Sequence, residues 1–437
     1  MSNDFPSILS ALEQNSKHKG SKLFCKDLST GEEYTYAKFN SLVNQCANFI
    51  QENYSNTRII SSALRNSIEG LVVFFGAQKV GASINPMPHS LSFNEIKKNL
   101  EFIESDLLFS EDSSISIGDK SLSLVEVDRK DNNFLEKISA YGDKFSFLPS
   151  SEDTAAFYYT SGTTSNPKCI EYTHANQISL IESICREFSY SPDAIHFGVL
   201  PIGHTAITNY QLLPVIFQGS SLFLAESYMD VRRNFWEIIY ENNISNIQTV
   251  PTVLEMIINT PTKFNDFKSL KMKYIGCGSA PLATELQNKF FEKFSLPVAN
   301  LYGLSETGPT HIDDPRADDW VPGTNYIIDT ATATLGYSNH NANGDFSNES
   351  FIPINNTTLP YSGTFEMPVG GGTYDIIGYA RALYSPPTTT TSTTTTTTTA
   401  DPCSGCDFST GSSSVIINGN CFNEHGGNTP AGGKGGI

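Results

Sequence analysis

Over residues 1–323 the chain alternates between short apolar segments and longer segments with helical periodicity. Segment 57–64 (TRIISSAL) is a short apolar strand. After it, apolar residues recur at helical spacing, and Gly81 ends that helical stretch. The same rhythm returns in five later apolar segments, with helical periodicity between them at 231–243 and 281–294. This alternation predicts an α/β fold with doubly wound, mostly parallel sheets. Ligands bind such sheets beyond the carboxyl ends of the strands, so we expect the chemistry in the loops that follow them.

The character of the chain changes near residue 324. Residues 324–437 hold only two of the 28 basic residues, and Thr, Asn, Ser and Gly dominate them. We predict an irregular, β-rich segment over 324–387, a Thr-rich linker over 388–400 and a disordered Gly/Ser-rich tail over 401–437.

Charge and cysteine usage narrow the class of protein. The formal net charge of −18 argues against a general nucleic-acid binder, which normally carries a basic surface. Residues 1–15 lack the basic and apolar regions of a signal peptide, and the longest apolar run, 70–77, is too short to span a bilayer. Five cysteines are scattered without framework spacing, which suits a reducing compartment: Cys25, Cys46, Cys169, Cys185 and Cys277. We therefore expect a soluble cytoplasmic protein.

Segment 155–176 (AAFYYTSGTTSNPKCIEYTHAN) has the composition of a phosphate-binding loop. An apolar strand runs into small hydroxyl residues and a glycine, and Lys168 follows. Small residues let backbone N–H groups converge on phosphate oxygens, while a lysine neutralises charge. The spacing differs from the Walker pattern GxxxxGK[ST], so it does not indicate a P-loop NTPase. Taken alone, the segment fits a polar turn with an incidental lysine equally well.

Segment 300–309 (NLYGLSETGP) brings a glutamate, Glu306, to the end of another apolar strand. A carboxylate there could hold Mg²⁺, which proteins bind through one or two carboxylates together with phosphate oxygens. Taken alone, an ordinary turn with Ser305 and Thr307 as helix caps is the favoured interpretation.

Two further segments follow apolar strands. Segment 199–206 (VLPIGHTA) places His204 just beyond a strand, although a lone histidine is more often structural than functional. Segment 277–282 (CGSAPL) puts small residues where a flat ring could approach the backbone; close packing of a strand on a helix is the alternative.

In this order the four segments resemble those of the adenylate-forming superfamily: acyl-CoA synthetases, aryl-CoA ligases, nonribosomal adenylation domains and beetle luciferases. YTSGTTSNPKC (159–169) is similar to the family's phosphate loop, [YF]-[ST]-S-G-T-T-G-x-P-K-G. VLPIGH is similar to LPLFH, CGSAPL to SGGAPL, and YGLSET to YGxTE. Upstream, GEEYTYAKFNSLVNQCANFI and GAQKVGASINPM resemble the family's first two segments, so the likeness spans about residues 20–323.

The resemblance implies that ATP and a carboxylic acid, fatty or aryl, react to give an acyl-adenylate and pyrophosphate, with Mg²⁺ present. In this family a thioester with CoA typically follows. The resemblance assigns catalytic roles to three residues: Lys168, Glu306 as the Mg²⁺ ligand, and His204 beside the acid. It assigns the phosphates to Thr160, Ser161, Gly162, Thr163 and Thr164, together with Lys168. The resemblance also assigns the α-phosphate contact to Ser305 and stacking of adenine to Tyr302. It assigns the remaining nucleotide contacts to Gly278, Ser279, Ala280 and Gly303.

The sequence also departs from the family pattern. Ser165 and Cys169 replace two loop glycines, and no lysine stands between Lys293 and Lys434, where the family's small C-terminal domain carries a catalytic lysine. We interpret the chain as a truncated adenylating domain joined to an unrelated segment. Two alternatives stay open: a nucleotide-binding pseudoenzyme that does not turn over, and a structural or interaction protein in which the Thr-rich tail matters. No aspartate follows VLPIGH to anchor an amine, which favours an acyl or aryl acid.

The tail contains one set of potential metal ligands, with the spacing C-x2-C-x14-C-x3-H: Cys403, Cys406, Cys421 and His425. This spacing could supply four zinc ligands. Because no periodic apolar residues accompany it, incidental cysteines are the favoured interpretation.

Overall fold

The chain divides into two compact units, Met1–Pro309 and Thr310–Ile437, which are described separately. The computed structural model describes residues 5–115, 122–129, 133–160, 168–305, 308–312, 315–316, 334–340, 346–353, 373–379, 414–417 and 420–423.

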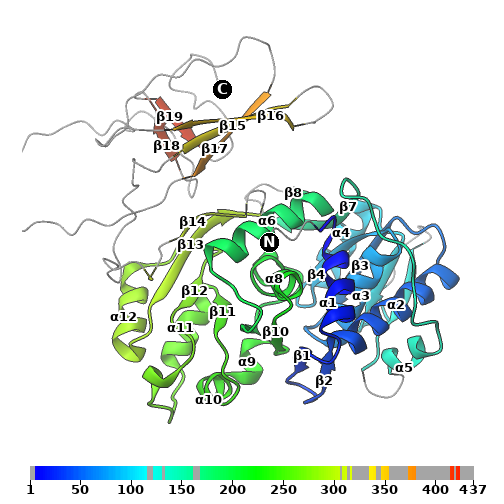
Figure 1. The fold of residues 1–437 in the computed structure, drawn as a ribbon, viewed down its shortest axis with the longest axis horizontal. Coiled ribbons are helices and arrows are strands. Elements are labelled where there is room, and N and C mark those ends of the chain that lie inside the picture. Colours follow the sequence, from blue (N-terminus) through cyan, green and yellow to red (C-terminus); the bar gives the residue numbers. More distant parts are fainter. Residues whose placement is uncertain are drawn as a thin grey trace, which may run out of the picture. The chain divides into compact units, whose positions relative to one another are not determined.

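The first sheet of the larger unit has eight strands in the order β14-β13-β12-β11-β9-β10-β1-β2 (Figure 1). Its strands are β1 (Leu23–Asp27), β2 (Glu33–Thr35), β9 (Ile195–Gly198), β10 (Ser221–Leu224), β11 (Asn246–Thr249), β12 (Ile275–Cys277), β13 (Val298–Leu304) and β14 (Gly308–Ile312). The six strands from β13 to β1 pair in parallel, and β2 runs antiparallel to β1. The N-terminal strand β1 pairs with β10, with Cys25 opposite Leu222.

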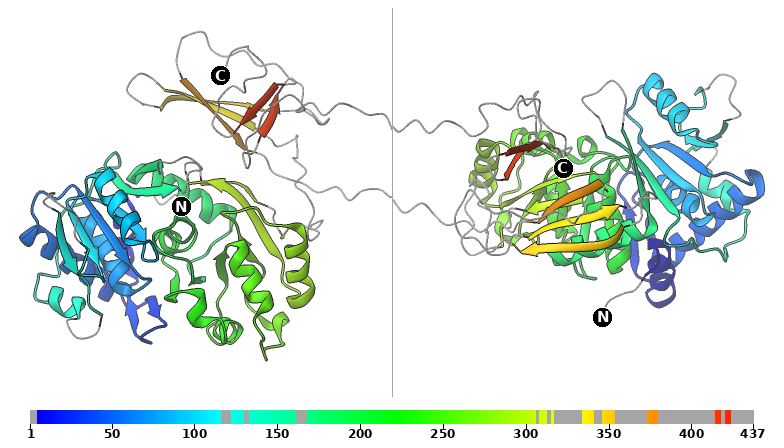
Figure 2. Two further views of the ribbon diagram at one scale, coloured as in Figure 1. Left: turned by 180° about the vertical axis from the view of Figure 1, so that it is seen from behind. Right: turned by 90° about the horizontal axis from the view of Figure 1, so that it is seen from above.

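The second sheet has six strands in the order β6-β5-β3-β4-β7-β8. Its strands are β3 (Ile59–Leu64), β4 (Ser83–Pro88), β5 (Leu107–Ser110), β6 (Ser123–Glu126), β7 (Thr154–Thr160) and β8 (Lys168–Thr173). All its pairs are parallel except β7 with β8, which form an antiparallel hairpin. The prediction of an α/β fold with mostly parallel sheets is confirmed, and the two sheets occupy opposite halves of the unit (Figure 2).

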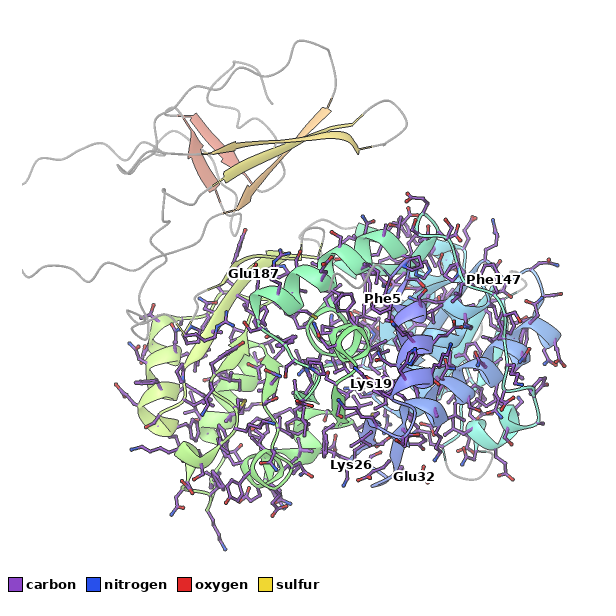
Figure 3. All side chains as sticks on the ribbon, in the orientation of Figure 1. Phe5, Lys19, Lys26, Glu32, Phe147 and Glu187 are labelled. Carbon is purple, nitrogen blue, oxygen red and sulfur yellow. The ribbon has the colours of Figure 1, made fainter. Side chains whose placement is uncertain are left out.

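Helices cover these sheets and lie between them. The longer ones are α1 (Ile8–His18), α2 (Tyr36–Asn53), α3 (Ile68–Lys79), α4 (Phe93–Ile103), α6 (His174–Glu187), α11 (Pro251–Asn259) and α12 (Thr284–Phe294). Shorter helical segments are α5 (Phe134–Ser139), α7 (Thr205–Ile207), α8 (Leu213–Gln218), α9 (Tyr228–Val231) and α10 (Phe235–Glu241), with a π-helix over Thr208–Leu212 and a 3-10 turn over Phe267–Ser269. Side chains fill the space between these elements (Figure 3).

Helix α3 shows how the core is built. Every residue from Ile68 to Lys79 is buried, and apart from Glu69, Gln78 and Lys79 the helix is apolar. The Ser67 side chain starts the helix by accepting a hydrogen bond from the Gly70 N–H at 3.1 Å. The helix packs on β3 and β4 on one side and on α2 on another.

The expected helix over 231–243 is wrong at its start. Val231 is the last residue of α9, and α10 begins at Phe235. The Asn234 carbonyl accepts from the Ile238 N–H at 2.8 Å, so the first intrahelical bond of α10 starts at that asparagine. Buried Val231 and buried Phe235 therefore belong to two successive short helices, although their spacing fits a single one.

In the smaller unit, the described backbone beyond residue 316 forms strands. β15 (Thr334–His340) pairs antiparallel with β16 (Phe346–Pro353) and with β17 (Thr373–Tyr379), and β18 (Ser414–Ile417) pairs antiparallel with β19 (Asn420–Asn423). The predicted Thr-rich linker, 388–400, lies outside the described residues. The boundaries predicted from composition stay predictions.

Candidate functional site

Three segments that are distant in sequence meet at Ser305. The Tyr172 hydroxyl, on β8, donates a hydrogen bond to the Ser305 carbonyl oxygen just beyond β13. The Oγ1 atom of Thr205 lies 3.5 Å from the Ser305 Oγ atom. Strand β8 after the predicted phosphate loop, the segment around His204 and the segment YGLSET are therefore neighbours.

The β7–β8 hairpin brings together the two ends of the predicted phosphate loop. Thr160 and Lys168 are paired across the hairpin. The loop residues Ser161, Gly162, Thr163 and Thr164, and Glu306 with its Mg²⁺ role, lie outside the described residues. The same holds for the side chains of Thr160 and Lys168. Their assigned contacts stay predictions.

His204 stands directly before α7, with its backbone N–H bonded to the Pro201 carbonyl at 3.0 Å. Its side chain is exposed, yet desolvation by the protein around it lowers the pKa of His204, which favours a neutral ring at pH 7. The preceding Gly203 packs against the end of β4, where a Cβ atom would collide with the backbone nitrogen of Pro88. This close approach accounts for a glycine directly before the histidine.

Asn66 fixes the same segment from the other sheet. Its side chain is buried just beyond β3 and bonds three backbone groups. Nδ2 donates to the Leu200 carbonyl at 2.7 Å and to the Ala225 carbonyl at 3.1 Å, and Oδ1 accepts from the Ile202 N–H at 2.9 Å. Sequence reasoning missed Asn66, although a polar residue two positions after an apolar strand was a usable signal.

The residues assigned to adenine lie at the ends of two adjacent strands. β12 and β13 are parallel neighbours, with Cys277 opposite Asn300, so Ser279 and Tyr302 follow at corresponding positions. Gly278 is buried and donates its N–H to the Thr249 carbonyl at 3.2 Å, whereas Ser279 and Ala280 are exposed. Tyr302 is 37% exposed. An exposed ring beside exposed small residues suits a planar base; the assignment stays a prediction.

Gly303 has a structural reason to be glycine. A Cβ atom at this position would collide with the Gly308 carbonyl oxygen on β14. The residue therefore permits the close approach of two backbones, whatever its part in binding a nucleotide.

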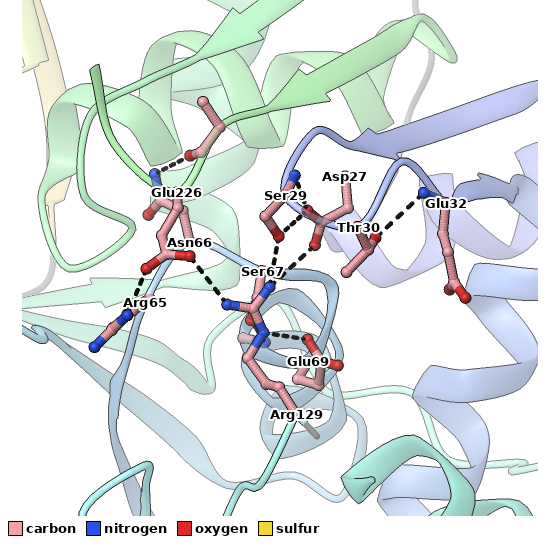
Figure 4. A network of polar contacts seen from close by, with 12 residues as sticks. Asp27, Ser29, Thr30, Glu32, Arg65, Asn66, Ser67, Glu69, Arg129 and Glu226 are labelled. Atoms are coloured by element: carbon pink, nitrogen blue, oxygen red, sulfur yellow. Dashed lines mark hydrogen bonds and ion pairs between the residues drawn. The ribbon is translucent and has the colours of Figure 1, made fainter. Parts of the chain in front are cut away.

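A network of charged side chains ties the two sheets together (Figure 4). The Arg129 guanidinium, just beyond β6, lies 3.7 Å from a carboxylate oxygen of Asp27 on β1, 3.5 Å from one of Glu69 on α3 and 3.3 Å from one of Glu226 beyond β10. Arg65, beyond β3, also binds Glu226, at 2.6 Å. Burial raises the pKa of Glu69, and the opposing attraction of Arg129 is the smaller effect. Sequence reasoning missed this network.

Over the part of the chain that the structure describes, no group of three or more His, Cys, Asp or Glu side chains is arranged to hold a metal ion. The predicted set Cys403, Cys406, Cys421 and His425 lies outside the described side chains. The five cysteines of the larger unit are free thiols. None of the described helices combines the length and apolarity needed to cross a bilayer.

Comparisons with known proteins agree with this architecture. The family of AMP-binding enzymes matches residues 12–329. The chain is 26% identical over 301 residues to 4-coumarate--CoA ligase 3 of Oryza sativa subsp. japonica, covering 65% of this chain and 53% of the relative. The chain thus spans about half the length of that relative. It is distantly related to acid–CoA ligases.

Two solved structures share the fold. ATP-bound MatB from Rhodopseudomonas palustris aligns with a TM-score of 0.65 at 18% identity, over 77% of this chain and 67% of that one. The N-terminal domain of FACL13 from Mycobacterium tuberculosis aligns with a TM-score of 0.64 at 19% identity, over 78% of this chain and 86% of that one.

Proposed function

Because the chain belongs to the family of AMP-binding enzymes, we propose that it binds ATP and a carboxylic acid and joins them as an acyl-adenylate. A carboxylate oxygen of the acid attacks the α-phosphorus in line, and the bond from that phosphorus to the bridging oxygen of the β-phosphate breaks. Pyrophosphate leaves with the electron pair of that bond. Positioning of the two reactants and neutralisation of charge supply most of the catalysis in such a reaction.

The observation that carries the proposal is the meeting of three segments at Ser305. The Tyr172 bond and the Thr205 contact place the strand after the phosphate loop, the proposed α-phosphate contact and the segment of His204 next to one another. An adenylating site needs the phosphates and the acid side by side. None of the three segments would support the proposal alone.

Each side chain has a proposed task. Lys168 and the hydroxyl and backbone groups of 160–164 would hold the phosphates, and Tyr302 with Gly278, Ser279 and Ala280 would hold the base. Glu306 would bind Mg²⁺, which neutralises phosphate charge when bound. His204, with its lowered pKa, would offer the acid a hydrogen bond from a neutral ring.

The acid and the acceptor are proposed at the level of chemical class. A fatty or aryl acid fits the lack of an aspartate after VLPIGH, and the relative named for 4-coumarate supports the aryl choice. CoA is the proposed acceptor of the acyl group, because that relative is named as a CoA ligase.

A second candidate is nucleotide binding without turnover. It is favoured by the absence of any lysine between Lys293 and Lys434 in this sequence. The two candidates agree on ATP binding and differ on pyrophosphate exchange.

The first test is thermal melting of the full chain with and without Mg²⁺·ATP, followed by ATP–pyrophosphate exchange with fatty and aryl acids. ATP at 100 times its dissociation constant should stabilise the fold by about 2.7 kcal/mol. Replacing Tyr302 by Ala should weaken ATP binding about tenfold, because base stacking on an aromatic ring is lost. Replacing Tyr240, an exposed tyrosine on α10, by Ala is the control. A cooperative melt that ATP leaves unmoved would refute both candidates.

A further inference from the structure

We propose that Tyr172 is a positioning residue that holds the backbone at Ser305 in place for ATP. The inference rests on the proposed function and goes beyond it, since none of the segments that resemble family motifs assigns this tyrosine a role. Its basis is one partly buried hydrogen bond between the two sheets.

The direction of the Tyr172 hydroxyl is fixed by its surroundings. The side chain is only 4% exposed. Its ring packs edge-to-face against the ring of Tyr158, with centroids 5.4 Å apart and planes at 83°. Tyr158 is itself 1% exposed on the adjacent strand β7. A ring held in this way keeps its hydroxyl directed at the Ser305 carbonyl oxygen.

That acceptor belongs to the other sheet. Tyr172 lies on β8 of the second sheet, and it donates to the carbonyl oxygen of Ser305 just beyond β13 of the first. The bond uses the backbone of Ser305 and not its hydroxyl, which faces Thr205. Tyr172 therefore acts on the position of the main chain and would not itself touch the nucleotide.

The position of Tyr172 along the chain links the strand of Lys168 to the backbone at Ser305. Tyr172 stands four residues after Lys168 in the same strand. One side chain thereby sets the spacing between the strand that carries Lys168 and the backbone that carries Ser305, the two elements proposed to bind phosphate. Groups that are already in place before the ligand arrives bind it more tightly, because less ordering is required.

The test compares Tyr172→Phe with Tyr158→Phe in the full chain. Both substitutions remove one buried hydroxyl and keep the ring, but only the first removes the bond to Ser305. We expect Tyr172→Phe to raise the Kd for Mg²⁺·ATP about fivefold, the worth of a typical hydrogen bond, and Tyr158→Phe to leave it unchanged. Hydrogen exchange of the peptide covering β13 should become faster in Tyr172→Phe alone.

The outcomes are distinct. If both variants bind ATP equally well, or if Tyr172→Phe only lowers the melting temperature without ATP, the positioning role is wrong while the proposed function stands. If the unmodified chain does not bind ATP, the proposed function fails and this role fails with it. A specific loss of ATP affinity in Tyr172→Phe supports both.

Discussion

A buried histidine in the centre of the first sheet should make the protein lose stability in mild acid. His196, on β9, is fully buried, and neither of its ring nitrogens has a hydrogen-bond partner among the described residues. The Tyr190 ring packs against the His196 ring nearly at right angles, with their centroids 4.6 Å apart. Burial lowers the pKa of His196 to about 3.

The sign and the size of the effect follow from that pKa. The histidine of the unfolded chain takes up a proton near pH 6.5, whereas His196 in the fold does not until about pH 3. The contribution of neutral His196 to the free energy of unfolding is therefore fully present above pH 6.5. It falls as the pH is lowered toward 3. At pH 5 the unfolded state gains about 2 kcal/mol from this one proton. His174, whose pKa burial lowers to about 4, acts in the same direction.

The assay is urea unfolding of the full chain, followed by tryptophan fluorescence, at pH 7.5 and pH 5. His196→Leu replaces the ring by an apolar side chain and removes the proton-binding group. Between the two pH values the unmodified chain should lose about 2 kcal/mol more unfolding free energy than this variant. His174 is present in both proteins and cancels in the comparison.

His89→Gln, which removes an exposed histidine, is the control. The reasoning would be refuted if His196→Leu lost as much stability between pH 7.5 and pH 5 as the unmodified chain. It would also be refuted if His89→Gln, like His196→Leu, lost about 2 kcal/mol less unfolding free energy than the unmodified chain between pH 7.5 and pH 5.

Three further substitutions test the contacts that join the two sheets, each measured by urea unfolding at pH 7.5. Asn66→Ala should cost about 2–4 kcal/mol because it leaves three buried backbone groups without partners; a cost below 1 kcal/mol would contradict the hydrogen bonds described. Arg129→Met should cost about 3–5 kcal/mol by stranding buried carboxylates; Arg58→Met, at an arginine with a 77% exposed side chain, is the control and should cost less than about 1 kcal/mol. Gly203→Ala should cost about 1–3 kcal/mol through its collision with β4; unchanged stability would disprove that close approach.

The sequence pattern predicts the elements well where periodicity is strong. The strand expected at 57–64 is β3, and the helix after it is α3, which ends at Lys79 just before Gly81. The pattern fails at 231–243 because hydrophobic spacing does not show where one short helix stops and the next begins. Ser305 and His204 both follow strands of the first sheet, as the pattern predicts, while their roles at a site stay predictions.

Partners that are distant in the chain could not be predicted in this way. The Tyr172 hydroxyl reaches a carbonyl 133 residues away, and the Asn66 amide reaches one 134 residues away. Each residue in isolation resembles an ordinary strand or turn residue, and only the packing of one sheet against the other gives it a partner. The same holds for Arg129, whose three carboxylates come from three separate parts of the chain.

The pairing of β1 with β10 has a consequence for the order of synthesis. β1 is synthesised before the other described strands, and Leu222, the partner of Cys25, follows 197 residues later. At about 5–20 residues per second, roughly 10–40 s of translation separate the two strands. During that interval β1 has only the short strand β2 beside it, and the buried residues Phe24 and Cys25 have no second neighbouring strand to cover them. β1 can pair with β10 only after all the strands of the second sheet have been synthesised.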